Sequence, residues 1–203
     1  MKDLERALAD ITAIRSQMAR GTQFRGYGPV TVAATGLLAL LAATLQAHYL
    51  PDPVGNVLGY LALWVGMAII AVVLAGVEMV ARTRRVHGGL ADEMLYQAAE
   101  QYIPAGVAGT LTTVVFYRYA PQALPLLPGL WQIFFSLAVF ASSRSLPRGM
   151  FAVGIWYLAA GLAVLAFSAT APLSPFAMVP FGVGQLFMAF ALYRATGGHD
   201  GED

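Results

Sequence analysis

Charged residues are almost absent from two long stretches of this chain. Only two occur in residues 26–81 and only three in residues 101–193. In the whole chain 11% of the 203 residues are charged, whereas about a quarter is usual in a soluble domain. A soluble fold of this size would need more charge on its surface. We therefore expect an integral membrane protein in contact with a lipid bilayer.

The apolar segments have the length that a bilayer requires. A helix crosses the hydrocarbon core with about 20 apolar residues, and six segments fit: 29–50, 57–81, 102–120, 123–141, 150–169 and 176–193. Proline or glycine lies at nearly every break between them. The predicted fold class is all-α, a polytopic bundle of six transmembrane helices preceded by a cytoplasmic amphipathic helix. Its parts are a lead-in over 1–28, a membrane domain over 29–193 with a cytoplasmic loop over 82–101, and a tail over 194–203.

The distribution of basic residues predicts the orientation. Of twelve lysines and arginines, all except Arg118 precede the first span or follow the second, fourth or sixth. Basic residues accumulate on the cytoplasmic side of bacterial membrane proteins. An odd number of spans would destroy this asymmetry, so the charges support six spans independently of hydropathy. We expect both termini in the cytoplasm.

Two amphipathic segments flank the membrane domain on that side. The first, within residues 2–20, carries an apolar face formed by Leu4, Leu8, Ile11 and Met18. It is either a docking or dimerisation helix for a soluble partner, or a helix that lies on the bilayer or under the bundle. The second, Leu90–Gln101, has an apolar and a polar side and leads into the third span past Pro104.

A few polar residues lie at the depth of the bilayer centre. Gln132 and Gln185 fall at the midpoints of the fourth and sixth spans, and Thr112 and Thr113 near that of the third. Such a midplane polar layer would bind a neutral or zwitterionic solute, or else form an interhelical hydrogen-bond clamp, and we favour the clamp. A proline precedes each glutamine by about one turn at 3.6 residues per turn. This similarity hints that spans three–four and five–six are related hairpins.

Two further features concern the inner face and the helix surfaces. Glu78 precedes Arg82 by four residues, the favourable order for an ion pair on a helix. We expect a structural pair there, with a gate residue as the alternative. Glycines at 55, 59, 66, 154 and 161 permit close helix approach, either within the bundle or at the seam of a homo-oligomer.

The composition argues against several classes of function. The chain has no cysteine and a formal charge of +1, so we expect neither thiolate chemistry nor nucleic-acid binding. Its three histidines lie far apart, and no nucleotide-binding, hydrolase or zinc motif is present. We expect no cofactor, no metal and no enzymatic activity.

Residues 127–148 (LPGLWQIFFSLAVFASSRSLPR), together with the start Asp3–Leu8, resemble an uncharacterised family of bacterial six-span inner-membrane proteins. The resemblance implies a location in the bacterial inner membrane, and it implies no activity. Because the sizeable polar features are the two cytoplasmic helices, our leading hypothesis is a regulatory or scaffold subunit that contacts a cytoplasmic or membrane partner. A small-solute transporter or channel that uses the midplane polar layer is the alternative.

Overall fold

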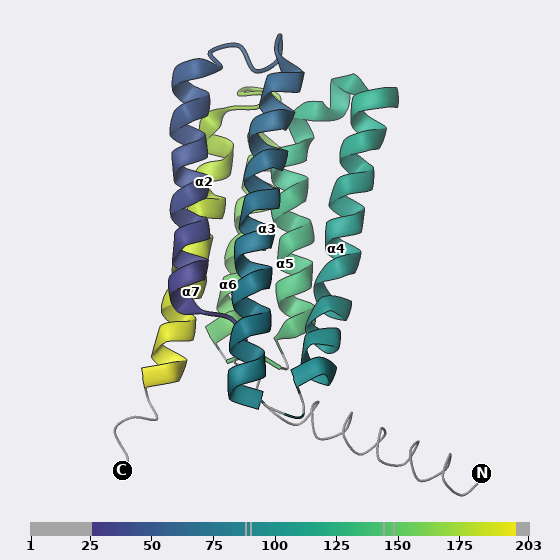
Figure 1. Ribbon diagram of the computed structural model, residues 1–203. Coiled ribbons are helices and arrows are strands. Elements are labelled where there is room, and N and C mark those ends of the chain that lie inside the picture. The colour runs from purple at the N-terminus through teal and green to yellow at the C-terminus, as the bar shows by residue number, and fades with distance from the viewer. Residues whose placement is uncertain (1–25, 88, 90, 144, 148, 198–203) are drawn as a thin grey trace, which may run out of the picture.

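The computed structural model describes residues 26–87, 89, 91–143, 145–147 and 149–197. Six long helices account for most of them and run alternately up and down (Figure 1). These helices are α2 (Pro29–Tyr49), α3 (Val57–His87), α4 (Ala91–Tyr119), α5 (Leu127–Ser142), α6 (Gly149–Phe167) and α7 (Val179–Gly197). Short 3-10 helices precede two of them, η2 (Pro121–Leu126) before α5 and η3 (Pro175–Met178) before α7. The described part of the chain contains no strand, so the expected all-α class is confirmed.

Five of these helices are long and apolar enough to cross a membrane. They comprise α2, α3, α6 and the two continuous segments that η2 forms with α5 and η3 with α7. Helix α4 is not among them, because glycine, threonine, Pro104 and Arg118 lower its mean hydropathy. It nevertheless lies alongside the others and spans the height of the bundle (Figure 1). The helices indicate a multi-pass membrane protein.

The region expected as a polar loop over 82–101 is mostly helical. Helix α3 continues to His87, and α4 begins at Ala91 and passes through Pro104 without interruption. The helix predicted over Leu90–Gln101 is thus the first part of α4. At this end of the bundle, called here the lower end, lie the start of α2, the end of α3, the start of α4 and the end of α7 (Figure 1). The α2–α3 connection and η2 lie at the opposite, upper end.

Two pairs of helices are in backbone contact through facing glycines. A Cβ on Gly36 of α2 would lie 2.9 Å from the Gly182 carbonyl oxygen of α7, and a Cβ on Gly182 would lie 3.0 Å from the Gly36 carbonyl oxygen. Likewise, a Cβ on Gly129 of α5 would lie 2.7 Å from the Gly161 carbonyl oxygen of α6, and a Cβ on Gly161 would lie 2.8 Å from the Gly129 carbonyl oxygen. Larger side chains would force these helices apart. Glycine is therefore needed at both crossings.

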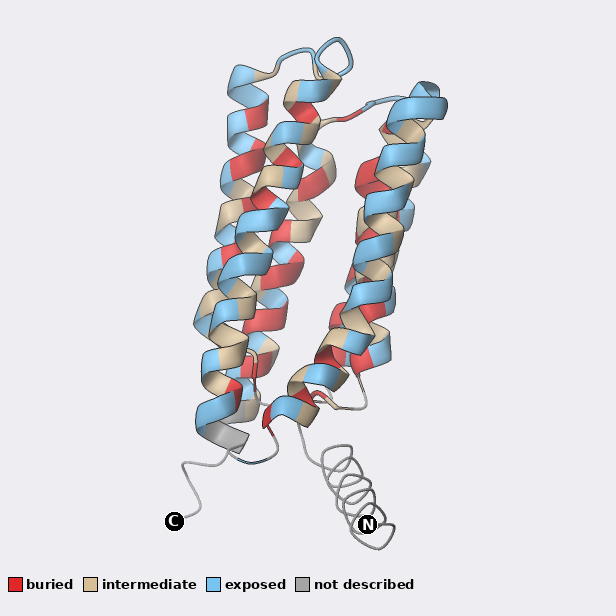
Figure 2. Cartoon of the chain, turned by 45° about the vertical axis from the view of Figure 1, so that its right-hand side comes forward, coloured by how far each residue is buried: buried red, intermediate tan, exposed pale blue. Residues whose placement is uncertain are grey.

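The core divides into an upper and a lower cluster of buried side chains. The upper cluster consists of Ala39, Ala42, Ala43, Tyr60, Trp64, Met67, Leu173 and Met178. The lower cluster consists of Val32, Met94, Ala98, Val139, Leu146, Met150, Val153, Tyr157, Met188, Ala189 and Leu192. Buried residues face the interior of the bundle and exposed residues face outward (Figure 2). Many exposed residues are apolar, among them Ile69, Val73 and Leu111, as expected for surfaces that face lipid.

Candidate functional site

The candidate site is a set of hydrogen bonds around residues 173–181, which we call the α6–α7 junction. Gln46 of α2 is fully buried and contacts it directly. Its Nε2 donates to the Leu173 carbonyl at 2.6 Å, and its Oε1 accepts from Trp64 Nε1 at 2.7 Å. A single side chain thereby links α2, α3 and the junction. Leu173 has φ 52°, in the left-handed region that side chains disfavour, so the bond to its carbonyl helps to hold a strained turn.

Gln132 of α5 contacts the junction from another side. Its Nε2 donates to the Ala177 carbonyl at 2.9 Å and to the Pro128 carbonyl of its own helix at 3.2 Å. The side chain is fully buried, and its Oε1 has no hydrogen-bond partner among the described residues. The amide therefore ties α5 to the start of α7, with one acceptor left over.

Two donors from α6 complete the contacts with the junction. Trp156 Nε1 donates to the Pro180 carbonyl at 2.9 Å, and the Tyr157 hydroxyl to the Phe181 carbonyl at 3.2 Å. Side chains of α2, α5 and α6 thus bind four backbone carbonyls of the junction. Each donor would be costly to leave unpaired in hydrocarbon, and the Leu173 carbonyl, which lies in an irregular turn, needs a partner too.

Trp131, beside Gln132, extends this network to α4 and α3. Its Nε1 donates to Thr113 Oγ1 at 3.0 Å, and Thr113 donates in turn to the Gly109 carbonyl at 2.7 Å. Its ring stacks on that of Tyr60, with the ring centroids 6.4 Å apart and the planes 7° apart. Thr112, the other threonine predicted here, is partly buried.

The two predicted glutamines do not share one contact. Gln132 is bound at Ala177, whereas Gln185 lies about two turns further along α7 at 3.6 residues per turn. There Gln185 packs against Gly36, at the α2–α7 crossing. Both are buried, at 0% and 8% exposure. The structure therefore places them in different contacts between helices.

The predicted inner-face pair lies on the lower part of α3. Glu78 and Arg82 are one turn apart, and both are partly buried. A Cβ on Gly28 would lie 3.1 Å from the Glu78 carboxyl carbon, so this carboxylate contacts the start of α2. A helix N-terminus attracts negative charge. The predicted docking face of Leu4, Leu8, Ile11 and Met18 lies outside the described residues.

A chain of aromatic rings fills the interior between the junction and the lower end. Phe135 packs edge-on against Tyr157 at 4.8 Å and Phe181 at 5.3 Å between centroids. The chain of rings continues from Phe135 to Tyr102, whose ring centroids are 6.2 Å apart, and from Tyr102 to Tyr27, whose ring centroids are 6.0 Å apart. Burial raises the pKa of the Tyr27 phenol, and the neighbouring Tyr102 adds to the effect, so Tyr27 stays neutral.

Gln46 is a site residue that the sequence did not predict. A glutamine near the end of a span is ordinary at a membrane interface, and nothing local indicated that it faces the interior. A buried tryptophan on the next span was the available signal, since its indole N–H needs an acceptor.

The chemistry of this site is that of neutral hydrogen-bonding groups. The buried polar residues of the described chain are threonine, serine and glutamine. Within that part, no group of three or more histidine, aspartate or glutamate side chains could hold a metal ion. Comparison with known protein families, with curated proteins and with solved structures finds no match to this chain.

Proposed function

We propose that this chain is a six-span protein of the bacterial inner membrane with both termini in the cytoplasm. The alternating directions of the six helices support this topology. The described arginines agree with it, since Arg82, Arg84, Arg85 and Arg194 belong to the lower end and Arg118 to the upper end. Basic residues favour the cytoplasmic side.

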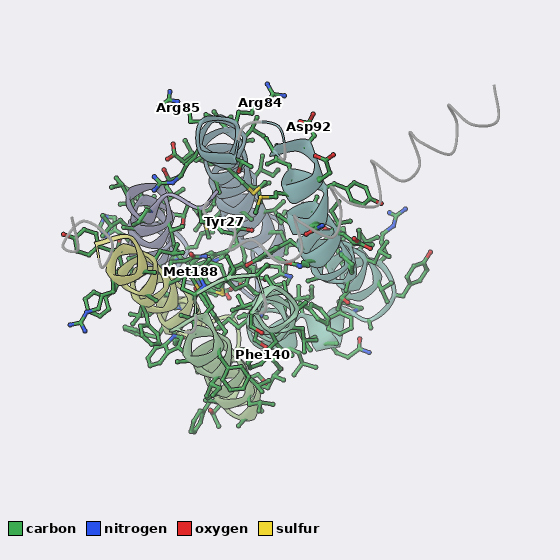
Figure 3. The ribbon with its side chains drawn as sticks, turned by 90° about the horizontal axis from the view of Figure 1, so that it is seen from below. Tyr27, Arg84, Arg85, Asp92, Phe140 and Met188 are labelled. Atoms are coloured by element: carbon green, nitrogen blue, oxygen red, sulfur yellow. The ribbon has the colours of Figure 1, made fainter. Side chains whose placement is uncertain are left out.

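Within that topology, the chain acts as a non-catalytic regulatory or scaffold subunit. The observation that carries this proposal is the exposed charge at the lower end. Arg84 and Arg85 of α3 and Asp92 of α4 lie on the outside of two adjacent helices (Figure 3). The apolar side of that part of α4 is already used, because Met94 and Ala98 belong to the lower cluster. The surface left for a partner is polar and of mixed charge, which suits a protein segment that also carries both signs.

Crosslinking in native membranes followed by affinity purification tests this function. Full-length protein is compared with a variant lacking residues 2–20 and with the double variant Arg84→Gln/Arg85→Gln. Arg118→Gln, the same change at the upper end, is the matched control. We expect one defined partner that is retained with Arg118→Gln and reduced with the double variant. Equal recovery with all variants, or no partner with any, would contradict the proposal.

A second candidate is a pathway for small neutral solutes. It is favoured by buried polar atoms that lack partners in the described chain, among them the Tyr60 hydroxyl and Gln132 Oε1 at the upper end and Thr83 Oγ1 at the lower end. Uptake of labelled urea and glycerol into liposomes, with Gln132→Leu and Gln185→Leu as variants, distinguishes the candidates. Loss of uptake in variants that remain folded supports transport. Lowered thermal stability without any uptake supports a structural clamp.

A further inference from the structure

The outward face of α7 carries an apolar stripe that ends in a single cation. Val183, Phe187 and Phe190 are exposed and follow one another at helical spacing, and Arg194 continues the series to the lower end of the bundle (Figure 1). At about 1.5 Å per residue, the stripe from Val183 to Arg194 is about 16 Å long, close to half the thickness of the hydrocarbon core. The stripe therefore has the length of one leaflet of the bilayer.

The Arg194 side chain lies over the residue one turn before it. Its guanidinium carbon, Cζ, is 4.9 Å from the centre of the Phe190 ring, within the range of a cation–π interaction. Both side chains are exposed. The ring thus holds the charge beside the apolar stripe, while the guanidinium N–H groups remain accessible at the membrane surface, where lipid phosphates lie.

The helices on either side of α7 supply no carboxylate for this arginine. A Cβ on Gly182 would lie 3.0 Å from the Gly36 carbonyl oxygen of α2, and a Cβ on Gly149 of α6 would lie 3.1 Å from the Ala191 Cβ. Helices α2 and α6 therefore flank α7, and none of the three contains an aspartate or a glutamate. Whereas α3 and α4 carry both signs of charge at the lower end, the end of α7 carries positive charge alone.

We propose that the lower end of α7 binds an anionic phospholipid of the adjacent leaflet. The phosphate accepts hydrogen bonds from the Arg194 guanidinium, and an acyl chain lies along Phe190, Phe187 and Val183. The headgroup supplies the negative charge that the flanking helices lack. The proposal depends neither on the regulatory function nor on which side of the membrane the lower end faces.

Quenching by brominated lipids tests the proposal. The chain has no cysteine, so Phe187→Cys in the full-length protein carries a single fluorescent label on the stripe. The labelled protein is reconstituted into vesicles of phosphatidylglycerol and phosphatidylcholine, with one of the two lipids brominated at a time. We expect phosphatidylglycerol to be enriched at the label by about fivefold, the contribution of one arginine near an anionic surface. Arg194→Gln should remove the enrichment, and Arg118→Gln, the matched change at the upper end, should leave it in place.

A second comparison separates this site from general attraction by positive charge. The double variant Arg84→Gln/Arg85→Gln removes two charges from the end of α3, and it should leave the enrichment at the label unchanged. A larger loss with this double variant than with Arg194→Gln would overturn the proposal. Equal quenching by the two lipids when Arg194 is present, or enrichment that persists in Arg194→Gln, would overturn it too.

The tail that follows α7 carries three acids, which lie outside the described residues. They are neutralised in the full-length chain by Asp200→Asn, Glu202→Gln and Asp203→Asn. We expect the enrichment to be present already without these changes. Enrichment that appears only after them would show that the tail, and not a lipid, occupies Arg194, and the proposal would be wrong.

Discussion

The upper and lower ends of the bundle are held together in different ways. At the upper end, glutamine and tryptophan side chains donate to particular backbone carbonyls of the α6–α7 junction. At the lower end, methionine, valine and leucine side chains pack around Met150 and Val153, and the side chains labelled Tyr27 and Met188 lie toward the interior (Figure 3). Hydrogen bonds depend on the position of single atoms, whereas apolar packing depends on filled volume. We therefore expect the two ends to respond to different kinds of substitution.

The largest effect is expected where packing volume is removed at the lower end. Met150 has 0% exposure, and Met150→Ala would leave a cavity that costs about 2–5 kcal/mol. Met150→Leu keeps the volume and should cost less than about 1.5 kcal/mol. Reversible unfolding in detergent micelles measures both. Equal losses for the two variants would mean that this end depends on specific contacts and not on volume.

Added volume should be damaging at a glycine crossing of the upper end. In Gly129→Ala the new methyl group would lie 2.7 Å from the Gly161 carbonyl, and overpacking of this kind costs about 1–3 kcal/mol. Gly66→Ala on α3 is the matched control, because a Cβ there meets nothing within 4 Å. Melting temperatures should fall for the first variant and hold or rise for the second. A similar fall in both variants would show that helix α3 is also closely packed at Gly66, and it would remove the contrast.

Loss of a hydrogen-bonding amide should matter at Gln46. Gln46→Met keeps the length of the side chain but leaves the Trp64 indole and the Leu173 carbonyl without their partner. Leaving the buried indole N–H unsatisfied costs about 1–3 kcal/mol. The expected result is a lower melting temperature together with a shift in Trp64 fluorescence. An unchanged spectrum and stability would mean that the upper end does not depend on these bonds.

The smallest effects are expected at the two predicted glutamines, and they should differ. Gln132→Met removes the bond to Ala177, and hydrogen bonds between membrane helices contribute about 0.6 kcal/mol on average. Gln185→Met removes no hydrogen bond that the structure records, so its stability should change less. Thermal melts of the two variants in parallel measure the difference. A larger loss of stability in Gln185→Met than in Gln132→Met would show that the more important amide lies on α7.

Hydropathy located the helices but not their full extent or their contacts. The spans 29–50 and 150–169 correspond closely to α2 and α6, because each begins and ends at glycine, proline or polar residues. The continuation of α3 to His87 was not predicted, since Arg82, Arg84 and Arg85 suggested an exposed loop. A helix can extend beyond the bilayer when its polar side faces water.

The contacts of the candidate site were less accessible still. Gln132 was recognised from its depth alone, and its partner, Ala177, is a backbone carbonyl that no sequence pattern marks. Gln46 bonds to Leu173, far along the chain, and that contact depends on how α2 packs against the α6–α7 junction. Tertiary arrangement decides such bonds, whereas hydropathy and charge carry only local information.

Six membrane crossings, with α4 as one of them, form the central claim, and labelling of single cysteines tests it most directly. The chain contains no cysteine, so each engineered thiol is the only one present. Asn56→Cys and Gln122→Cys report on the upper end, and Arg85→Cys and Ser145→Cys on the lower end. A membrane-impermeant maleimide is applied to right-side-out and inverted membrane vesicles. We predict that Asn56→Cys and Gln122→Cys react in right-side-out vesicles, and that the other two react in inverted ones. Reaction of Gln122→Cys on the same side as Arg85→Cys would show that α4 does not cross, and would contradict the six-span account.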